Sequence, residues 1–157
     1  MRIIAIDPGY ERLGIAIIDK ATGGKETLVF SECFETSRDL EHGERLALVG
    51  NRVREAIAEH EPGACAIETL FFAKNQKTAT KVAEVRGVIL AEATRGGLPV
   101  FEYTPMQVKV AVTGYGKSDK GQVTFMTKKL LRVDKDALDD EYDAMAVGLT
   151  CFARERF

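Results

Sequence analysis

Short apolar runs open this chain, separated by only a few polar or turn-forming residues. The runs predict strands at 2–7, 13–18 and 27–33, and the turns between them contain Pro8-Gly9 and Gly23-Gly24. Strands joined by such short turns pair antiparallel, because a parallel pair needs a long crossover connection. We therefore expect an antiparallel meander at the start of the fold.

After residue 40 the apolar positions follow a helical period. Leu46, Val49, Val53 and Ile57 fall on one stripe of a helix at about 40–60. The later predicted elements are, in order, a strand at 64–68, a helix at 76–95, a strand at 98–103, a short helix that begins at Thr104-Pro105, and helices at 119–132 and 139–154. Helical crossovers favour parallel strands. The pattern thus predicts an α/β fold with a mixed five-stranded sheet, three antiparallel strands then two parallel, flanked by helices.

The composition is that of one globular domain covering residues 1–157. Hydrophobic residues make up 45% and charged residues 29% of the sequence, which is typical of soluble proteins. No apolar run approaches the ~20 residues of a membrane span, and Asp7 interrupts the first apolar stretch where a signal peptide would continue. We therefore expect a cytoplasmic location.

Cysteine and histidine are too few for several kinds of site. The three cysteines are far apart and predict reduced, buried thiols, and only two histidines are available. The sequence therefore has few histidines from which to build a histidine-rich zinc site or a Ser-His-Asp triad. Any hydrolytic chemistry in this chain has to rest on carboxylates.

Charge is segregated along the chain although the net charge is only -2. The segment 74–132 contains eleven Lys and Arg and four Asp and Glu, whereas the rest contains eleven and twenty. Solvated helix faces would account for this pattern. A surface that binds a polyanion beside an acidic cluster would account for it equally well.

Acidic residues end two of the predicted strands. Asp7 closes the first strand and Glu68 closes the fourth. If these strands are parallel neighbours, their carboxyl ends meet at one edge of the sheet, where ligands bind in open sheets of this sort. The two carboxylates are therefore candidates for one site.

The last predicted helix begins in a cluster of six acids between Asp134 and Asp143. Capping and the helix dipole account for Asp139, Asp140 and Glu141, which belong to the first turn. They do not account for Asp143, which shares with Asp140 the face that packs on the sheet. Buried carboxylates need a compensating cation, and oxygen ligands favour Mg²⁺ or Mn²⁺. Two such ions would suit phosphodiester hydrolysis; a structural acid network or a single-ion site are the alternatives.

Five segments carry a resemblance to a known family. They are AIDPG at 5–9, AIETLFFAKN at 66–75, RGVILAEA at 86–93, GLPVFEYTPMQVKVAVTGYGKSDK at 97–120 and DDEYDAMAVGL at 139–149. Together they closely resemble the RuvC crossover junction endodeoxyribonucleases, bacterial Holliday junction resolvases with a ribonuclease H-like fold. The resemblance implies a homodimeric nuclease that uses two Mg²⁺ ions per site, which Mn²⁺ can replace, and nicks a four-way junction symmetrically. It also implies association with a branch-migration motor complex.

The resemblance assigns roles to particular residues. Its four catalytic and metal-binding acids fall on Asp7, Glu68, Asp140 and Asp143, with Asp139 as an adjacent alternative to Asp140. Two lysines near the scissile phosphate match Lys109 and Lys120. The DNA-binding candidates are Phe71, Phe72, Lys74, Asn75, Lys77, Lys109, Lys117 and Lys120, and Phe71 matches an aromatic that stacks on an unpaired base.

Several features stay open at this stage. The segment ERLGIAII departs from the family pattern, since it keeps Gly14 but has Leu13 and Ala16 at neighbouring positions. Val85 and Val88 lie off the apolar stripe of their helix and would suit a partner copy, or a second contact within the chain. The rival function is a non-catalytic or differently selective branched-DNA-binding protein of the same fold.

Overall fold

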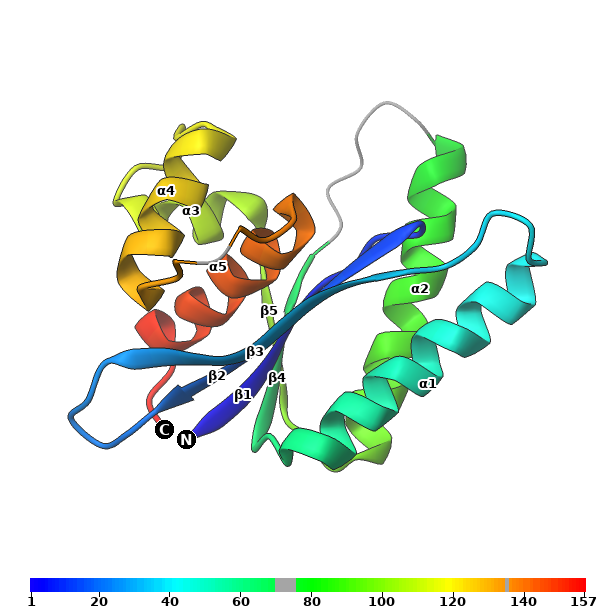
Figure 1. Ribbon diagram of the computed structural model, residues 1–157, viewed down its shortest axis with the longest axis horizontal. Coiled ribbons are helices and arrows are strands. Elements are labelled where there is room, and N and C mark those ends of the chain that lie inside the picture. The colour runs from blue at the N-terminus through cyan, green and yellow to red at the C-terminus, as the bar shows by residue number, and fades with distance from the viewer. Residues whose placement is uncertain (70–75, 135) are drawn as a thin grey trace.

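A central sheet lies between two layers of helices in the computed structural model, which describes residues 1–69, 76–134 and 136–157 (Figure 1). In chain order the elements are β1 (Arg2–Asp7), β2 (Arg12–Lys20), β3 (Glu26–Glu35), α1 (His42–His60), β4 (Ala64–Glu68), α2 (Gln76–Arg95), β5 (Val100–Tyr103), α3 (Pro105–Thr113), α4 (Lys120–Leu131) and α5 (Asp139–Arg154). None of the described helices is long and apolar enough to cross a membrane.

The sheet has the predicted mixed topology. Its strand order is β3-β2-β1-β4-β5, with antiparallel pairing of β1 to β2 and of β2 to β3. The strands β1 and β4 pair in parallel, as do β4 and β5. The α/β class and the antiparallel meander are therefore confirmed.

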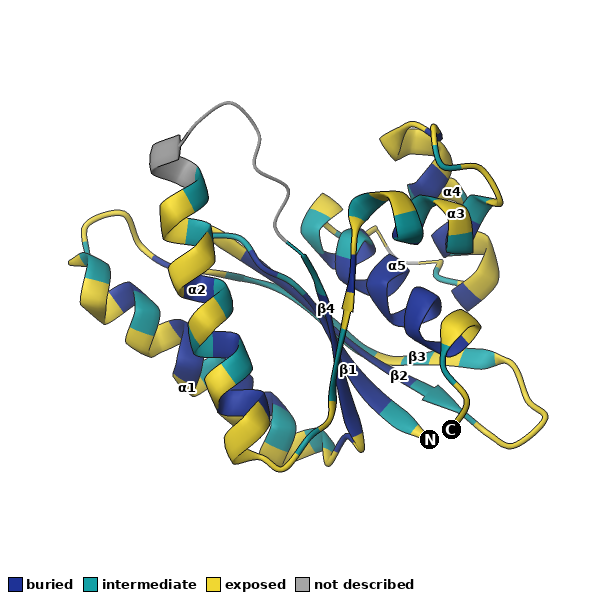
Figure 2. Ribbon diagram, turned by 180° about the vertical axis from the view of Figure 1, so that it is seen from behind, coloured by how far each residue is buried: buried dark blue, intermediate teal, exposed yellow. Residues whose placement is uncertain are grey.

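Both faces of the sheet are buried, and alternate residues of β1 serve alternate faces. Ile3 and Ala5 belong to the core beneath α3, α4 and α5, whereas Ile4 and Ile6 belong to the core beneath α1 and α2. Figure 2 shows buried residues running along both β1 and β4 between the two helix layers. A strand buried on both faces needs a continuous apolar run, which is what residues 3–6 provide.

The helix α5 packs close against the sheet because small residues line the contact. A Cβ atom on Gly148 would lie 2.6 Å from Cδ1 of Ile18 and 3.1 Å from Cβ of Ala5. A side chain at this position would require the end of the Ile18 side chain to move and the contact with Ala5 to widen by a few tenths of an ångström. Gly148 therefore allows α5 to pack this closely on the sheet.

Most predicted boundaries agree with the structure to within about two residues. The cap at Thr104 is confirmed, since its hydroxyl accepts a hydrogen bond from the Gln107 amide at 3.2 Å and Pro105 opens α3. Val85 is only 1% exposed and packs in the chain's own core, so the second contact for this residue lies within the chain. Arg86 forms an ion pair with Glu102 on β5.

Candidate active site

The two strand-end acids lie on neighbouring strands and point to the same face. Ile6 pairs with Ile67 in the parallel register, so Asp7 and Glu68 follow at the same level of the sheet. Each acid comes two residues after an alanine, Ala5 or Ala66, that faces α5. By the two-residue period of a strand, both carboxylates point toward α5.

A close backbone contact brings the first turn of α5 to these acids. A Cβ atom on Gly14 would lie 2.0 Å from the carbonyl oxygen of Asp140. Gly14 is the register partner of Asp7 on β2. The contact therefore places Asp140 beside the end of β1, and it explains why glycine stands at this position of ERLGIAII. Leu13 and Ala16 are buried in the two apolar cores.

Burial and neighbouring carboxylates raise the pKa values of Asp7, Glu68 and Asp143. Burial, followed by the charges of Glu68, Asp143 and Asp140, raises the pKa of Asp7 to about 8. Burial and the charge of Asp143 raise the pKa of Glu68 to about 7, against the opposing charges of Lys109 and Lys120. Such coupling requires the acids to be close together in a poorly solvated place.

Lys120 is the nearest counter-charge of this group. Its Nζ lies 2.9 Å from Oδ2 of Asp143 and 3.4 Å from Oδ2 of Asp139. Burial opposes its charge, but these contacts raise the pKa of Lys120. Burial raises the pKa of Asp143 although Lys120 opposes the shift. Lys120 opens α4, where Asp119 caps the helix through the amide of Gln122 at 2.9 Å.

Asp139 and Asp140 differ in their placement. The side chain of Asp139 is 72% exposed, whereas that of Asp140 is 25% exposed. Asp140 is approached by Nη1 of Arg12 at 3.7 Å and by the thiol of Cys33 at the same distance. The semi-buried position of Asp140 makes it the better candidate ligand, and Arg12 is a site neighbour that sequence reasoning missed.

The expectation that Asp139 caps α5 was wrong. Leu138 occupies the cap position. The carboxylate of Glu141, which is buried, accepts hydrogen bonds from the Leu138 amide at 3.1 Å and from the Ser31 hydroxyl at 2.6 Å. Glu141 thus holds the helix start against β3, a tertiary contact that helix periodicity does not reveal.

The remaining candidates fall in three groups. Lys109 is half-buried on α3 and acts on Glu68 through its charge, whereas Lys117 is exposed between α3 and α4. Lys77 belongs to the first turn of α2. Outside the described residues lie Phe71, Phe72, Lys74 and Asn75.

The donor chemistry of the cluster suits a hard divalent cation, although the side chains do not close around one centre. No described side chain forms a hydrogen bond or ion pair with the carboxylate of Asp7 or Glu68, so both keep free oxygens for a ligand. Within the described ranges, however, no three His, Cys, Asp or Glu side chains already form a metal-binding group. Asp143 is instead paired with Lys120 and Asp140 is drawn toward Arg12.

The fold and the carboxylate edge define a protein of the ribonuclease H-like class. The profile of the family described as crossover junction endodeoxyribonuclease RuvC matches residues 3–151. The chain belongs to this RuvC family.

Named relatives extend over the whole chain. The RuvC endodeoxyribonuclease of Thermosipho melanesiensis is 44% identical and is aligned over 100% of both chains. That of Roseiflexus is 43% identical over 94% of this chain and 88% of its own. The Thermus thermophilus RuvC structure superposes with a TM-score of 0.88 at 32% identity, covering 98% of this chain and 94% of the other. A second structure shows T. thermophilus RuvC in complex with a Holliday junction substrate, at 30% identity.

Proposed function

We infer that this chain is a structure-selective endodeoxyribonuclease that resolves four-way DNA junctions. The observation that carries this inference is the carboxyl group of Asp7, held at a strand end among three further carboxylates in a member of the RuvC family. A non-catalytic binding protein would have no use for so costly a cluster, because grouped carboxylates in a poorly solvated place repel one another.

Membership of the family implies the use of a divalent metal ion. We propose that Asp7, Glu68, Asp140 and Asp143 would hold two Mg²⁺ ions, or Mn²⁺ in their place. Such ions lower the pKa of bound water and neutralise charge on a phosphodiester. The carboxylates are the matching oxygen donors, and the paired strands β1 and β4 fix two of them in position.

The lysines supply the cationic part of the proposed site. Lys120 and Lys109 both act on the carboxylates through their charge. When a phosphodiester enters, either ammonium group would balance the negative charge that grows on its oxygens during cleavage. Lys120 would then exchange its contact with Asp143 for one with the substrate.

Contacts with the arms of the junction complete the proposal. Lys117 is exposed and free to meet the DNA backbone, as positively charged side chains do in sequence-independent binding. Phe71, Phe72, Lys74, Asn75 and Lys77 are proposed to contact DNA near the crossover, with Phe71 stacking on a base. Symmetric nicking of two strands calls for a homodimer, and we retain a branch-migration motor complex as a further proposed partner.

A nicking assay on synthetic junctions tests the proposed function. Mobile and fixed four-way junctions and a linear duplex of the same sequence would be incubated with the protein and Mg²⁺. We expect paired nicks at symmetric positions in the junctions and none in the duplex. Asp7→Asn should abolish the nicks while junction binding persists, whereas the exposed Asp134→Asn should cleave as the native chain does. Equal cleavage by Asp7→Asn would overturn the assignment.

A further inference from the structure

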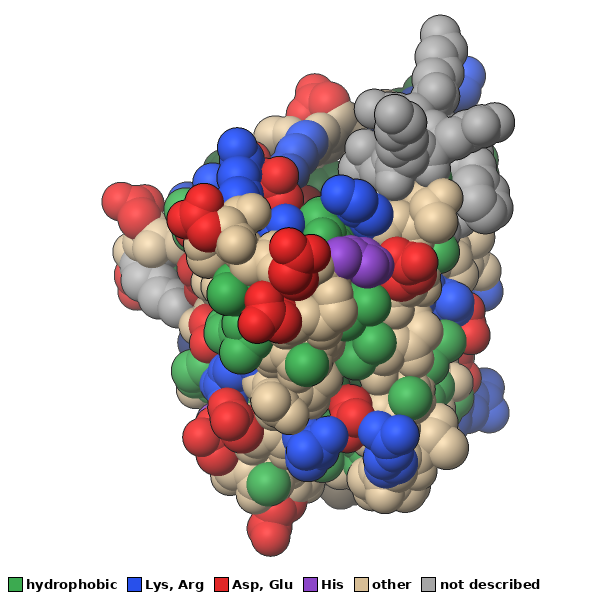
Figure 3. Space-filling view, turned by 90° about the vertical axis from the view of Figure 1, so that its right-hand side faces the viewer, with side chains coloured by type: hydrophobic (Ala, Val, Ile, Leu, Met, Phe, Trp, Pro, Cys, Tyr) green, Lys and Arg blue, Asp and Glu red, His purple; other side chains and the backbone are tan. Residues whose placement is uncertain are grey.

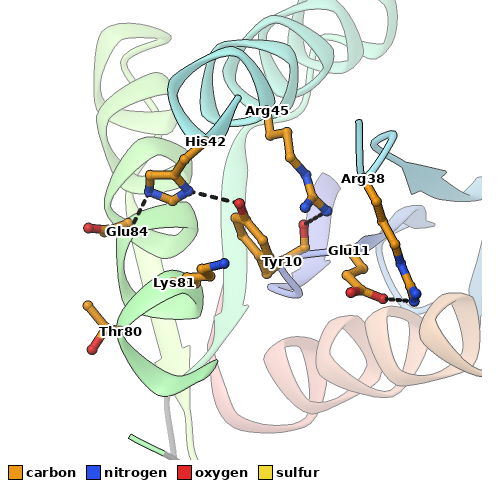
Figure 4. Close-up of a pocket in the computed structure, with 8 residues that line it drawn as sticks. All are labelled: Tyr10, Glu11, Arg38, His42, Arg45, Thr80, Lys81 and Glu84. Atoms are coloured by element: carbon orange, nitrogen blue, oxygen red, sulfur yellow. Dashed lines mark hydrogen bonds and ion pairs between the residues drawn. The ribbon is translucent and has the colours of Figure 1, made fainter. Parts of the chain in front are cut away.

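A pocket of about 920 Å³ lies at the carboxyl end of β1, on the side of the sheet opposite the carboxylates. It is bounded by the turn between β1 and β2, by the start of α1 and by α2 (Figure 4). The outer surface of α1 and α2 carries interspersed acidic and basic side chains (Figure 3), so the pocket is not part of a broad basic face. The charge of the pocket is therefore set by the residues that line it.

The ring of Tyr10 stands at the centre of this pocket, covered by two cations. The guanidinium carbon of Arg45 lies 4.0 Å and the Nζ of Lys81 lies 4.7 Å from the ring centroid. The hydroxyl of Tyr10 lies 2.9 Å from Nδ1 of His42, whose Nε2 lies 2.7 Å from the carboxylate of Glu84. This chain of contacts fixes the ring relative to both helices.

The charges in the pocket do not cancel. Of its two carboxylates, Glu11 is paired with Arg38 at 2.5 Å and Glu84 contacts His42. Arg45 donates to two neutral acceptors, the Thr36 hydroxyl at 2.9 Å and the Tyr10 carbonyl at 3.2 Å. Over the described parts of the chain, Lys81 and Arg45 have no carboxylate partner. With His42 neutral, the three cations of the lining exceed its two carboxylates by one, so an anion entering the pocket would meet a net positive charge carried by Lys81 and Arg45.

The pocket is tied to the carboxylate edge through a short piece of backbone. Tyr10 follows Asp7 by three residues, a span of at most ~11 Å. Arg12, next to the pocket residue Glu11, reaches Asp140 at 3.7 Å. An anionic chain with one charge at the carboxylates and another in the pocket would therefore need only a short length between them.

We propose that this pocket holds a backbone phosphate of the substrate DNA, a few nucleotides from the phosphate at the carboxylates. Lys81 is the contacting group, since it is exposed, and the Tyr10–Arg45 stack forms the wall behind it. The strand would thus cross the edge of the sheet from the α5 side to the α2 side. This inference rests on the proposed function and adds a contact to it.

The salt dependence of junction binding tests the inference. Affinity for a synthetic four-way junction would be measured in EDTA at several salt concentrations for the native chain, Lys81→Ala and Lys81→Arg. Lys25→Ala is the matched control, because Lys25 is exposed in the turn between β2 and β3, at the other end of the sheet. Loss of one phosphate contact should lower the slope of log K against log salt by about 0.9.

The expected result is a lower slope and roughly five- to tenfold weaker binding at 0.1 M salt for Lys81→Ala alone. Lys81→Arg, which keeps the charge, should restore the slope. If Lys81→Ala behaves like Lys25→Ala while the native chain binds and nicks junctions, the pocket contact is refuted and the proposed function stands. If the native chain neither binds nor nicks junctions, the proposed function itself fails.

Discussion

The ammonium group of Lys120 lies 2.9 Å from the carboxylate of Asp143, so the first residue of α4 and the second turn of α5 are joined by an ion pair at the edge of the sheet. Among the described residues, this is the only ion pair between a lysine and one of the four proposed metal ligands. In the function we propose, Lys120 is a partner of the acids before substrate binds and a counter-charge for a phosphate afterwards.

Replacing Lys120 with methionine should slow the chemical step more than it weakens binding. The variant loses a cation beside the developing negative charge, a change that typically costs ~10²-fold in kcat. Single-turnover cleavage of a junction at saturating protein measures this directly. Lys129→Met is the matched control, because Lys129 is exposed on the same helix. Equal cleavage rates for the two variants would show that Lys120 does not take part in the chemical step.

Metal-free protein should lose stability as the pH rises from about 4 to about 8. The pKa of Asp7 is about 8 in the folded chain, against an ordinary value of 3.8. Over that interval the folded state binds a proton that the unfolded state has released, so the free energy of unfolding falls with rising pH. Glu68, whose pKa is raised to about 7, acts in the same direction.

Thermal unfolding in EDTA at several pH values checks this dependence. Asp7→Asn should unfold at a higher temperature than the native chain at pH 8, and the difference should vanish near pH 4. Adding Mg²⁺ at pH 8 should stabilise the native chain more than the variant. Asp134→Asn, which alters an exposed acid, should follow the native profile. A native profile that rises toward pH 8 would contradict the buried state of Asp7.

Gly14→Ala should damage both stability and cleavage. The new methyl group would lie 2.0 Å from the Asp140 carbonyl oxygen, so the first turn of α5 has to shift. Backbone clashes of this kind typically cost about 1–3 kcal/mol. Gly87→Ala is the control, because a Cβ atom there meets nothing within 4 Å on a helix. The control should gain up to about 1 kcal/mol from helix propensity. Denaturant unfolding and a nicking assay report both effects.

The variants Asp140→Asn and Asp139→Asn should show which of the two adjacent acids is needed for cleavage. Asp140 is semi-buried beside β2, whereas the side chain of Asp139 is 72% exposed and, of the residues that the structure describes, pairs only with Lys120. We expect Asp140→Asn to lose cleavage by at least an order of magnitude and Asp139→Asn to retain most of it. Titrating Mg²⁺ in the nicking assay provides the measurement. If Asp139→Asn lost more cleavage than Asp140→Asn, Asp139 would replace Asp140 as the proposed metal ligand.

Strand parity explains why much of the candidate site could be predicted from sequence. The two-residue period of a strand places Ile3, Ala5 and Asp7 on one face of β1. A helical crossover between β1 and β4 favours their parallel pairing. Asp140 and Asp143 follow from the three-residue spacing on α5. In each case the local period determines the direction of the side chain.

Other contacts depend on tertiary structure that no local pattern contains. Glu141 is buried because Ser31, 110 residues away, donates to it. Val85 faces inward because α2 packs on α1 as well as on the sheet. The pocket around Tyr10 draws residues from the β1–β2 turn, α1 and α2, so its cations share no motif in the sequence.

The depth of α5 in the core has a consequence for local motion. Residues Ala144–Phe152 are all buried, and the helix touches all five strands of the sheet. Its amide protons, with those of β1 and β4, should be among the slowest to exchange with solvent. Lys120 begins a helix with a far more exposed face. The acids therefore belong to the part of the molecule that should open least often. The side chain of Lys120, their counter-charge, can move without that part opening.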